Sequence, residues 1–208
     1  MPNRSCLFLL LSLTLSCRVS AQHAAVQIKI YDDADLSPGT RQQFVTRLEN
    51  ILVGAGVSAR VSLCGRAIAC ETDGGESRRL LIRVTGGQAR TMSNAQKPPL
   101  GQSLIGPNGG DYAFVFLPTV KDRAAEADIS WVTVLAHAAA HEIGHLLLGN
   151  GSHTPMGLMK ATWDHNDFER MNQKCLHFSD EQARQLALRY GETEAVHSRV
   201  AGVIAGQR

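Results

Sequence analysis

Two histidines and a glutamate stand close together in the run His141-Glu142-Ile143-Gly144-His145. In an α-helix, residues four apart lie on one face, one turn apart, so both imidazoles can be directed at a single metal ion. Zinc favours such nitrogen ligands and, at catalytic sites, combines three protein ligands with a water. Glu142 stands beside the first ligand and can accept a proton from that water, whose pKa the zinc lowers. The pattern predicts one catalytic Zn²⁺ ion, His141 and His145 as ligands, and Glu142 as general base.

The alternative is a chance grouping of these residues on a solvated helix. Three alanines at 138–140 and three leucines at 146–148 flank the group, so the helix is apolar nearly all round and is expected to be buried. Two imidazoles and a carboxylate are costly in a buried helix unless something binds them. The flanks therefore favour the metal site.

A third ligand is expected after the helix, which should end at Gly149 because glycine accepts a positive φ. The turn that follows, Asn150-Gly151-Ser152, leads to His153. His153 is the predicted third zinc ligand, and an exposed loop histidine is the alternative. Glu169 and Glu181 are downstream candidates for a glutamate ligand of the gluzincin kind.

Together these residues resemble the metzincin zinc endopeptidases, whose signature is H-E-x-x-H-x-x-G-x-x-H followed by a Met-turn. The first five positions match completely and have the H-E-x-G-H form of the matrixins. Gly149 lies one place later than the family's glycine, and His153 two places later than its third histidine, where this chain has Gly151. Glycines on both sides make such a two-residue bulge easy to build.

Gly157-Leu158-Met159 resembles the Met-turn, in which the methionine lies beneath the metal without binding it. The resemblance implies that Met159 has this role, with Met156 as the alternative and a plain core methionine as the simpler interpretation. His137, one turn before His141, is expected to support the ligands or to be packed in the core. The segment 163–167 is either a wall of the substrate pocket or a polar loop, and we favour the loop.

The resemblance also implies a fold, an α/β (α+β) catalytic domain. It has a twisted mixed sheet of about five strands, a long active-site helix and a small C-terminal helical part. In metzincins an antiparallel edge strand binds extended peptide substrates by β-augmentation. That strand would consist here of Ser103, Leu104, Ile105 and Gly106.

Local patterns predict the elements of this fold. Strands are expected at 26–31, 57–63, 80–84, 103–105 and 112–117, with a surface loop at 86–99. Helices are expected from Pro38, after an N-cap at Ser37, to Gly54; from Asp128 or Ser130 to Leu148; and from a capping box at 179–182 onward. This order fits one domain with a mixed sheet.

Residues 1–21 resemble a secretory signal, with Arg4, an apolar run at 7–15 and the small residues Val19-Ser20-Ala21 at the cleavage site. A lipoprotein signal ending at Cys17 is the alternative. We predict a catalytic domain at 22–192, a flexible tail at 193–208, and a secreted or periplasmic location. The apolar run is too short for a membrane span, so no stable membrane insertion is expected after the signal is removed.

Loss of residues 1–21 removes Arg4 and Arg18, which leaves acidic and basic residues in balance. Nothing basic remains to suggest a nucleic-acid partner, and a monomer is expected. Export implies an oxidising compartment, so a Cys64–Cys70 disulfide is predicted, while pairing of either cysteine with Cys175 stays open.

The sequence thus predicts a secreted zinc-dependent endopeptidase that acts on peptides or proteins through a zinc-bound water activated by Glu142. Two alternatives remain. One is a secreted zinc-bound module that kept the fold without catalysis. The other is a gluzincin-type peptidase with a downstream glutamate ligand.

Overall fold

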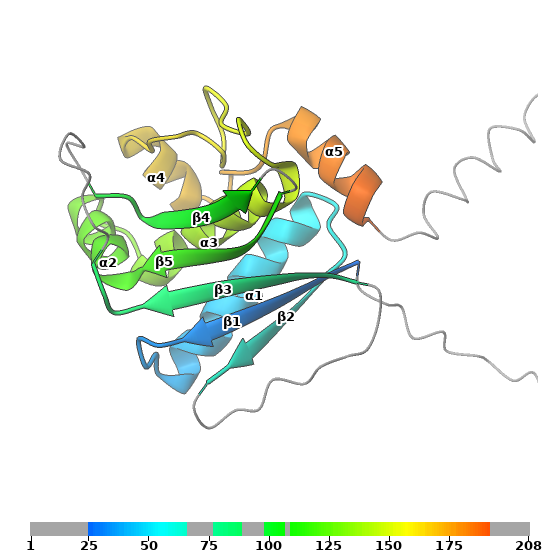
Figure 1. Ribbon diagram of the computed structural model, residues 1–208. Helices are drawn as coiled ribbons and strands as arrows, with labels where there is room; N and C mark the ends of the chain where they lie inside the picture. Colours follow the sequence, from blue (N-terminus) through cyan, green and yellow to red (C-terminus); the bar gives the residue numbers. More distant parts are fainter. Residues whose placement is uncertain (1–24, 66–76, 89–97, 107–108, 192–208) are drawn as a thin grey trace, which may run out of the picture.

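A five-stranded sheet forms the centre of the computed structural model (Figure 1), which describes residues 25–65, 77–88, 98–106 and 109–191. The strand order is β2-β1-β3-β5-β4. The strands are β1 Val26–Asp32, β2 Ala59–Cys64, β3 Arg78–Thr85, β4 Gly101–Gly106 and β5 Gly109–Phe116. All neighbours pair in parallel except β4, which runs antiparallel to β5. The predicted α/β class, with a mixed sheet of five strands and an antiparallel edge, is confirmed.

Five helices accompany the sheet in the described residues (Figure 1). They are α1 Pro38–Gly54, α2 Leu117–Glu126, α3 Trp131–Leu148, α4 His165–Asn172 and α5 Asp180–Tyr190. Helices α1 and α3 pack against each other, α3 also packs on β4 and β5, and both helices lie on the same face of the sheet. The small C-terminal part, with α4 and α5, lies on the other side of α3.

The core between the sheet and these helices is built by alternation in the strands and helical spacing in α1. Along β1, Val26, Ile28 and Ile30 are fully buried, while the residues between them are half-buried. From α1 the side chains of Phe44 and Leu48 join the same core. Because α3 is covered by the sheet on one side and by the C-terminal part on the other, it is buried nearly all round, as its apolar flanks predicted.

Most predicted helix ends are confirmed. Ser37 caps α1 through its side chain, and Ser130, the second of two candidates, is the N-cap residue of α3. Gly149 ends α3 with a φ of 88°, and Ser179 opens α5 in the expected capping box.

Several element bounds differ from the prediction, and three of the differences have a clear physical cause. The second strand is Ala59–Cys64 rather than 57–63, because Val57 still belongs to the turn after α1. Leu117 does not end the fifth strand but begins α2, whose first turn contains Pro118. The polar segment after Trp163 is not a loop. Asp164 forms a capping box with Asp167, and α4 follows.

Several sequence predictions fall on residues that the structure does not describe. They are the signal at 1–21, the tail at 193–208 and Cys70, the first-choice partner of Cys64. Cys175 carries a free thiol, so neither alternative pairing through this residue is present. Among the described helices, none combines the length and apolar character that crossing a bilayer requires.

Candidate metal centre

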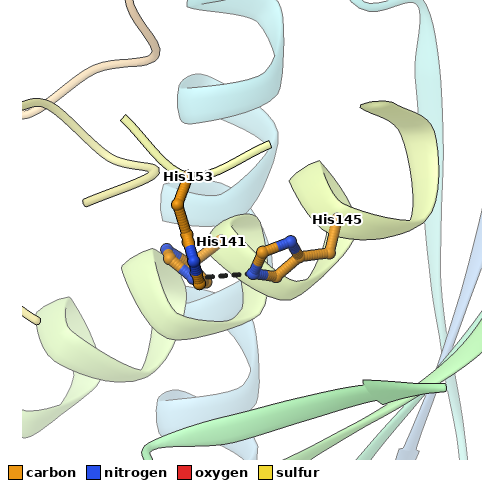
Figure 2. Close-up of side chains that lie close together, drawn as sticks. All are labelled: His141, His145 and His153. Carbon is orange, nitrogen blue, oxygen red and sulfur yellow. Dashed lines mark hydrogen bonds between the residues drawn. The ribbon is translucent and has the colours of Figure 1, made fainter. Parts of the chain in front are cut away.

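The imidazoles of His141, His145 and His153 meet at one point (Figure 2). Helix α3 carries the first two, and the loop after α3 brings the third in from above. One ring nitrogen from each lies within 4.8 Å of the others. The Nε2 atoms of His141 and His145 are 3.1 Å apart, close to the separation of about 3.3 Å that two nitrogens have around a tetrahedral zinc at 2.0–2.1 Å. The donor set and its spacing fit a zinc ion.

The second nitrogen of each helical histidine is already engaged. His141 Nδ1 donates a hydrogen bond of 2.8 Å to the Leu158 carbonyl oxygen, and His145 Nδ1 lies 2.9 Å from Ser152 Oγ. A hydrogen bond at Nδ1 selects the tautomer whose Nε2 has a free lone pair for a metal. His141 therefore presents an Nε2 lone pair to the space between the rings, and His145 does the same when its Nδ1 donates to the Ser152 hydroxyl.

Electrostatics keep these two imidazoles neutral at physiological pH, as metal ligands must be. Burial lowers the pKa of His141 to about 4, although the hydrogen bond to Leu158 opposes the shift. Burial also lowers the pKa of His145 to about 4, with smaller contributions from His141 and His153. The side chain of His153 is exposed, whereas those of His141 and His145 are half-buried.

Glu142 lies beside the histidines and is only 5% exposed. Ser103 on β4 donates a hydrogen bond of 2.6 Å from its Oγ to Glu142 Oε2. Burial raises the pKa of Glu142 to about 7, and the Ser103 hydrogen bond opposes that shift. A carboxylate with a pKa near the operating pH is well suited to general-base chemistry.

Gly101, at the start of β4, makes room for this carboxylate. A Cβ atom at Gly101 would lie 2.6 Å from Glu142 Oε1, which is too close for any side chain. Neither this requirement nor the Ser103–Glu142 hydrogen bond was predicted. Both depend on how the antiparallel edge strand aligns with α3, and no local pattern reports that alignment.

Met159 is fully buried beneath the histidine-bearing helix. Its sulfur occupies the space that a side chain at Gly144 would need, and Phe178 Cε1 would lie 2.8 Å from that Cβ. Close packing against a neighbour is thus the reason for the glycine, as the sequence indicated. Met156, the alternative for the floor of the site, is 68% exposed.

A cleft of about 1170 Å³ runs past the three histidines and Glu142. Its walls come from β4, α3, the end of α2 and the segment after the Met-turn, and include Ser103, Ile105, Ala138, Arg123, Trp163 and Phe168. The Trp163 indole stands edge-on to the His141 ring, with centroids 5.6 Å apart. It also donates to the Leu158 carbonyl that accepts from His141. The cleft thus follows the predicted substrate strand, where Leu104 points to the opposite face and is half exposed.

The other candidate ligands do not join the cluster. His137 is buried and its Nδ1 lies 2.8 Å from the Thr133 carbonyl oxygen. Burial lowers its pKa to about 4 against that hydrogen bond, so His137 is the packed residue that was expected. Glu169 pairs with His165 at 3.3 Å. Glu181 contacts Arg184 and Gln185 on the exposed side of α5.

No protein-family model matches the sequence, and a search of curated proteins finds no match. Solved structures do match the fold. An archaemetzincin from Methanopyrus kandleri superposes with a TM-score of 0.55 at 13% identity, over 79% of this chain and 94% of that one. Metalloproteinase-II from Bacteroides fragilis gives a TM-score of 0.45 at 12% identity, over 83% of this chain and 55% of that one. The first likeness shows that this chain has the fold of an archaemetzincin, and the second is too low to support an argument.

Proposed function

We propose that this protein is a secreted zinc-dependent endopeptidase of the metzincin type. The observation that carries the proposal is the convergence of three imidazoles beside a buried glutamate. This group lies in a cleft along the edge strand of the sheet. The likeness in fold to an archaemetzincin supports the proposal, as does the match to the matrixin-like form of the motif at 141–145.

His141, His145 and His153 would hold one Zn²⁺ ion. When bound, zinc supplies a lowered pKa for a water and polarisation of the scissile carbonyl. The rest of the reaction depends on residues of the chain. Met159, which is fully buried against Gly144 of α3, is the proposed apolar floor of the site.

Glu142 is the proposed general base and, later, the general acid. Its carboxylate accepts a proton from the attacking water and then gives it to the leaving amine. Oε2 is held by the Ser103 hydroxyl, so the carboxylate has one orientation before the substrate arrives. A buried, hydrogen-bonded base beside the ligands favours catalysis over simple zinc binding, because a module that only binds zinc has no need of it.

The proposed substrate is an extended peptide or protein segment. Strand β4 is the edge of the sheet, and its antiparallel pairing uses only the side that faces β5. The other side can therefore pair with a peptide laid along the cleft. Secretion or export to the periplasm, which the N-terminal sequence supports, and action as a monomer complete the proposal.

The test compares the parent chain with Glu142→Gln, which preserves size and loses the base. Both proteins should contain about one zinc per chain by elemental mass spectrometry. The parent should cleave a mixed peptide library, and a chelator should abolish the cleavage. The variant should lose turnover by at least about 1000-fold. Zinc without cleavage in the parent would favour the non-catalytic module, and unchanged hydrolysis by the variant would refute the mechanism.

A further inference from the structure

A chain of hydrogen bonds connects the last helix to the candidate metal centre. Gln182, in the first turn of α5, donates from Nε2 to the Ser152 carbonyl oxygen at 2.8 Å. Ser152 Oγ lies 2.9 Å from His145 Nδ1. We propose that Gln182 and Ser152 are positioning residues of the zinc site, which fix the loop carrying His153 and the ring of His145 before the metal binds. This inference rests on the proposed function.

The loop between α3 and the Met-turn needs such support. Its histidine, His153, lies two residues later than in the metzincin spacing, and the loop contains glycines at 149 and 151, with φ of 88° and 74°. Hydrogen bonds at its two ends, from Gly149 N to His145 O and from Thr154 N to Met159 O, leave the middle to be held from outside. Ser152, next to the exposed His153, is where that outside contact is made.

Gln182 is well placed for this task because it is 7% exposed and both ends of its amide are used. Oε1 accepts from Ser179 N at 3.3 Å, which completes the capping box of α5. Nε2 donates to Ser152. A backbone N–H can only donate and a carbonyl can only accept, so one amide orientation satisfies both partners.

The two halves of the amide can be separated by one substitution. Glu at 182 can still accept from Ser179, since capping boxes use Glu and Gln alike. It cannot donate to Ser152, and it places an oxygen against the carbonyl. Gln182→Glu thus retains the helix cap and breaks the contact with the loop, whereas Gln182→Ala removes both.

The consequence concerns metal affinity. Partners that orient a ligand from behind typically change metal affinity by about 10- to 100-fold when they are removed. Ser152 contacts His145 through its hydroxyl and precedes His153 in the sequence. Ser152 and Gln182 should therefore both contribute to zinc affinity. Because Gln182 acts through Ser152, losing both should cost less than the sum of the two single losses.

The experiment measures the zinc dissociation constant by competition with a chromogenic chelator, and the visible spectrum of the Co²⁺-loaded protein. Gln182→Glu and Ser152→Ala should each raise the dissociation constant by about 10- to 100-fold and change the Co²⁺ spectrum. Gln185→Glu is the matched control, with the same charge change on the exposed side of α5. It should bind zinc as the parent does.

Melting of the metal-free proteins separates support of the site from support of the helix. The Gln182→Ala variant should melt at a lower temperature because it loses the cap, while Gln182→Glu should stay closer to the parent. Parent-like zinc binding by Gln182→Glu, with tight binding in the parent, would overturn this inference alone. A parent that binds no zinc would overturn the proposed function and this inference with it.

Discussion

The candidate site has two unlike parts, one on helix α3 and one on the loop that follows it. Helix α3 carries His141, Glu142 and His145, and the sheet and the C-terminal part enclose it. The loop carries His153, which is exposed. Packing of α3 holds its three residues independently of any metal, with Glu142 buried and both histidines half-buried. The place of His153 depends instead on a few hydrogen bonds of the loop. The part on α3, which we call the rigid part, is suited to proton transfer, and the loop completes the ligand set.

Removing His153 tests this division most severely. His153→Ala should raise the zinc dissociation constant by at least about 100-fold, since one of three ligands that share roughly 10 kcal/mol or more of binding is lost. The metal-free protein should melt close to the parent, because the His153 side chain is exposed and its ring contacts are with the two other imidazoles. Elemental mass spectrometry and thermal melting after chelation measure the two effects.

His141→Ala is the corresponding ligand substitution in the rigid part. It should lose zinc as well, but it also leaves a cavity and removes one of the two hydrogen bonds that the Leu158 carbonyl accepts, so the metal-free protein should melt lower. If His153→Ala holds zinc as tightly as the parent, the loop is not part of the metal site. The contrast between helix and loop would then have no functional meaning.

Ser103→Ala tests the contact between strand β4 and Glu142, the proposed general base in the rigid part. A hydrogen bond to a charged group contributes about 1.5–3 kcal/mol, so kcat should fall by about 10- to 100-fold, with KM and zinc content little changed. The hydroxyl lowers the pKa of Glu142 against the effect of burial. Its removal should therefore raise that pKa and move the acid limb of the kcat/KM profile to higher pH.

Two further variants at β4 check that assignment. Ser103→Thr keeps a hydroxyl and should recover most of the activity and the original pH profile. Leu104→Ala alters the opposite, half-exposed face of the same strand and should leave the acid limb in place. An unchanged kcat and pH profile in Ser103→Ala would mean that the edge strand does not position the base.

Sequence reasoning found the part of the site that local spacing encodes. The pair His141 and His145 needs only a helix, and Met159 needs only its distance from that helix. The mixed sheet with an antiparallel edge strand followed from the resemblance. The contacts that were not predicted join residues far apart in the sequence, such as the hydrogen bond to Glu142 from Ser103, 39 positions earlier.

Two short helices were missed for a different reason, because their signals were present and were outweighed. Leu117-Pro118 is a proline in a first helical turn, but the apolar run before it favoured a strand. Asp164 and Asp167 form a capping box with aspartate in place of the usual glutamate. Polar composition alone had suggested a loop there.

Gly144→Ala tests how closely the Met-turn packs on the rigid helix. The added Cβ would meet the Met159 sulfur and, at 2.8 Å, Phe178, and both side chains are buried with little space to move. Overpacking costs about 1–3 kcal/mol, which the better helix propensity of alanine offsets in part. We expect a net loss of up to about 2 kcal/mol in the free energy of unfolding, measured by denaturant titration of the metal-free protein.

Gly39→Ala in α1 is the matched control for that substitution. Nothing lies within 4 Å of a Cβ at Gly39, so helix propensity acts alone and the variant should be slightly more stable than the parent. If Gly144→Ala is also stabilising, Met159 and Phe178 move aside at little energetic cost. The rigid part would then be less tightly packed than the contrast with the loop requires.

The smallest expected effect concerns His137, which shares the burial of the rigid part but not its metal chemistry. Burial lowers the pKa of His137 in the folded protein from its ordinary 6.5 to about 4, so as pH falls through 6.5 the unfolded chain binds a proton that the folded chain does not. His137 therefore reduces stability as pH falls from 6.5 to 4. One pH unit below 6.5 the loss is about 1 kcal/mol.

His137→Gln keeps a donor for the Thr133 carbonyl and does not titrate. With chelator present, its unfolding free energy should fall less than the parent's between pH 7.5 and 5.5. At pH 7.5 the difference in unfolding free energy between parent and variant reports packing alone. Only the change in that difference between pH 7.5 and 5.5 reports protonation of His137. Parallel pH profiles would show that α3 opens enough to let water reach this ring, so its histidines would not be held in place by burial.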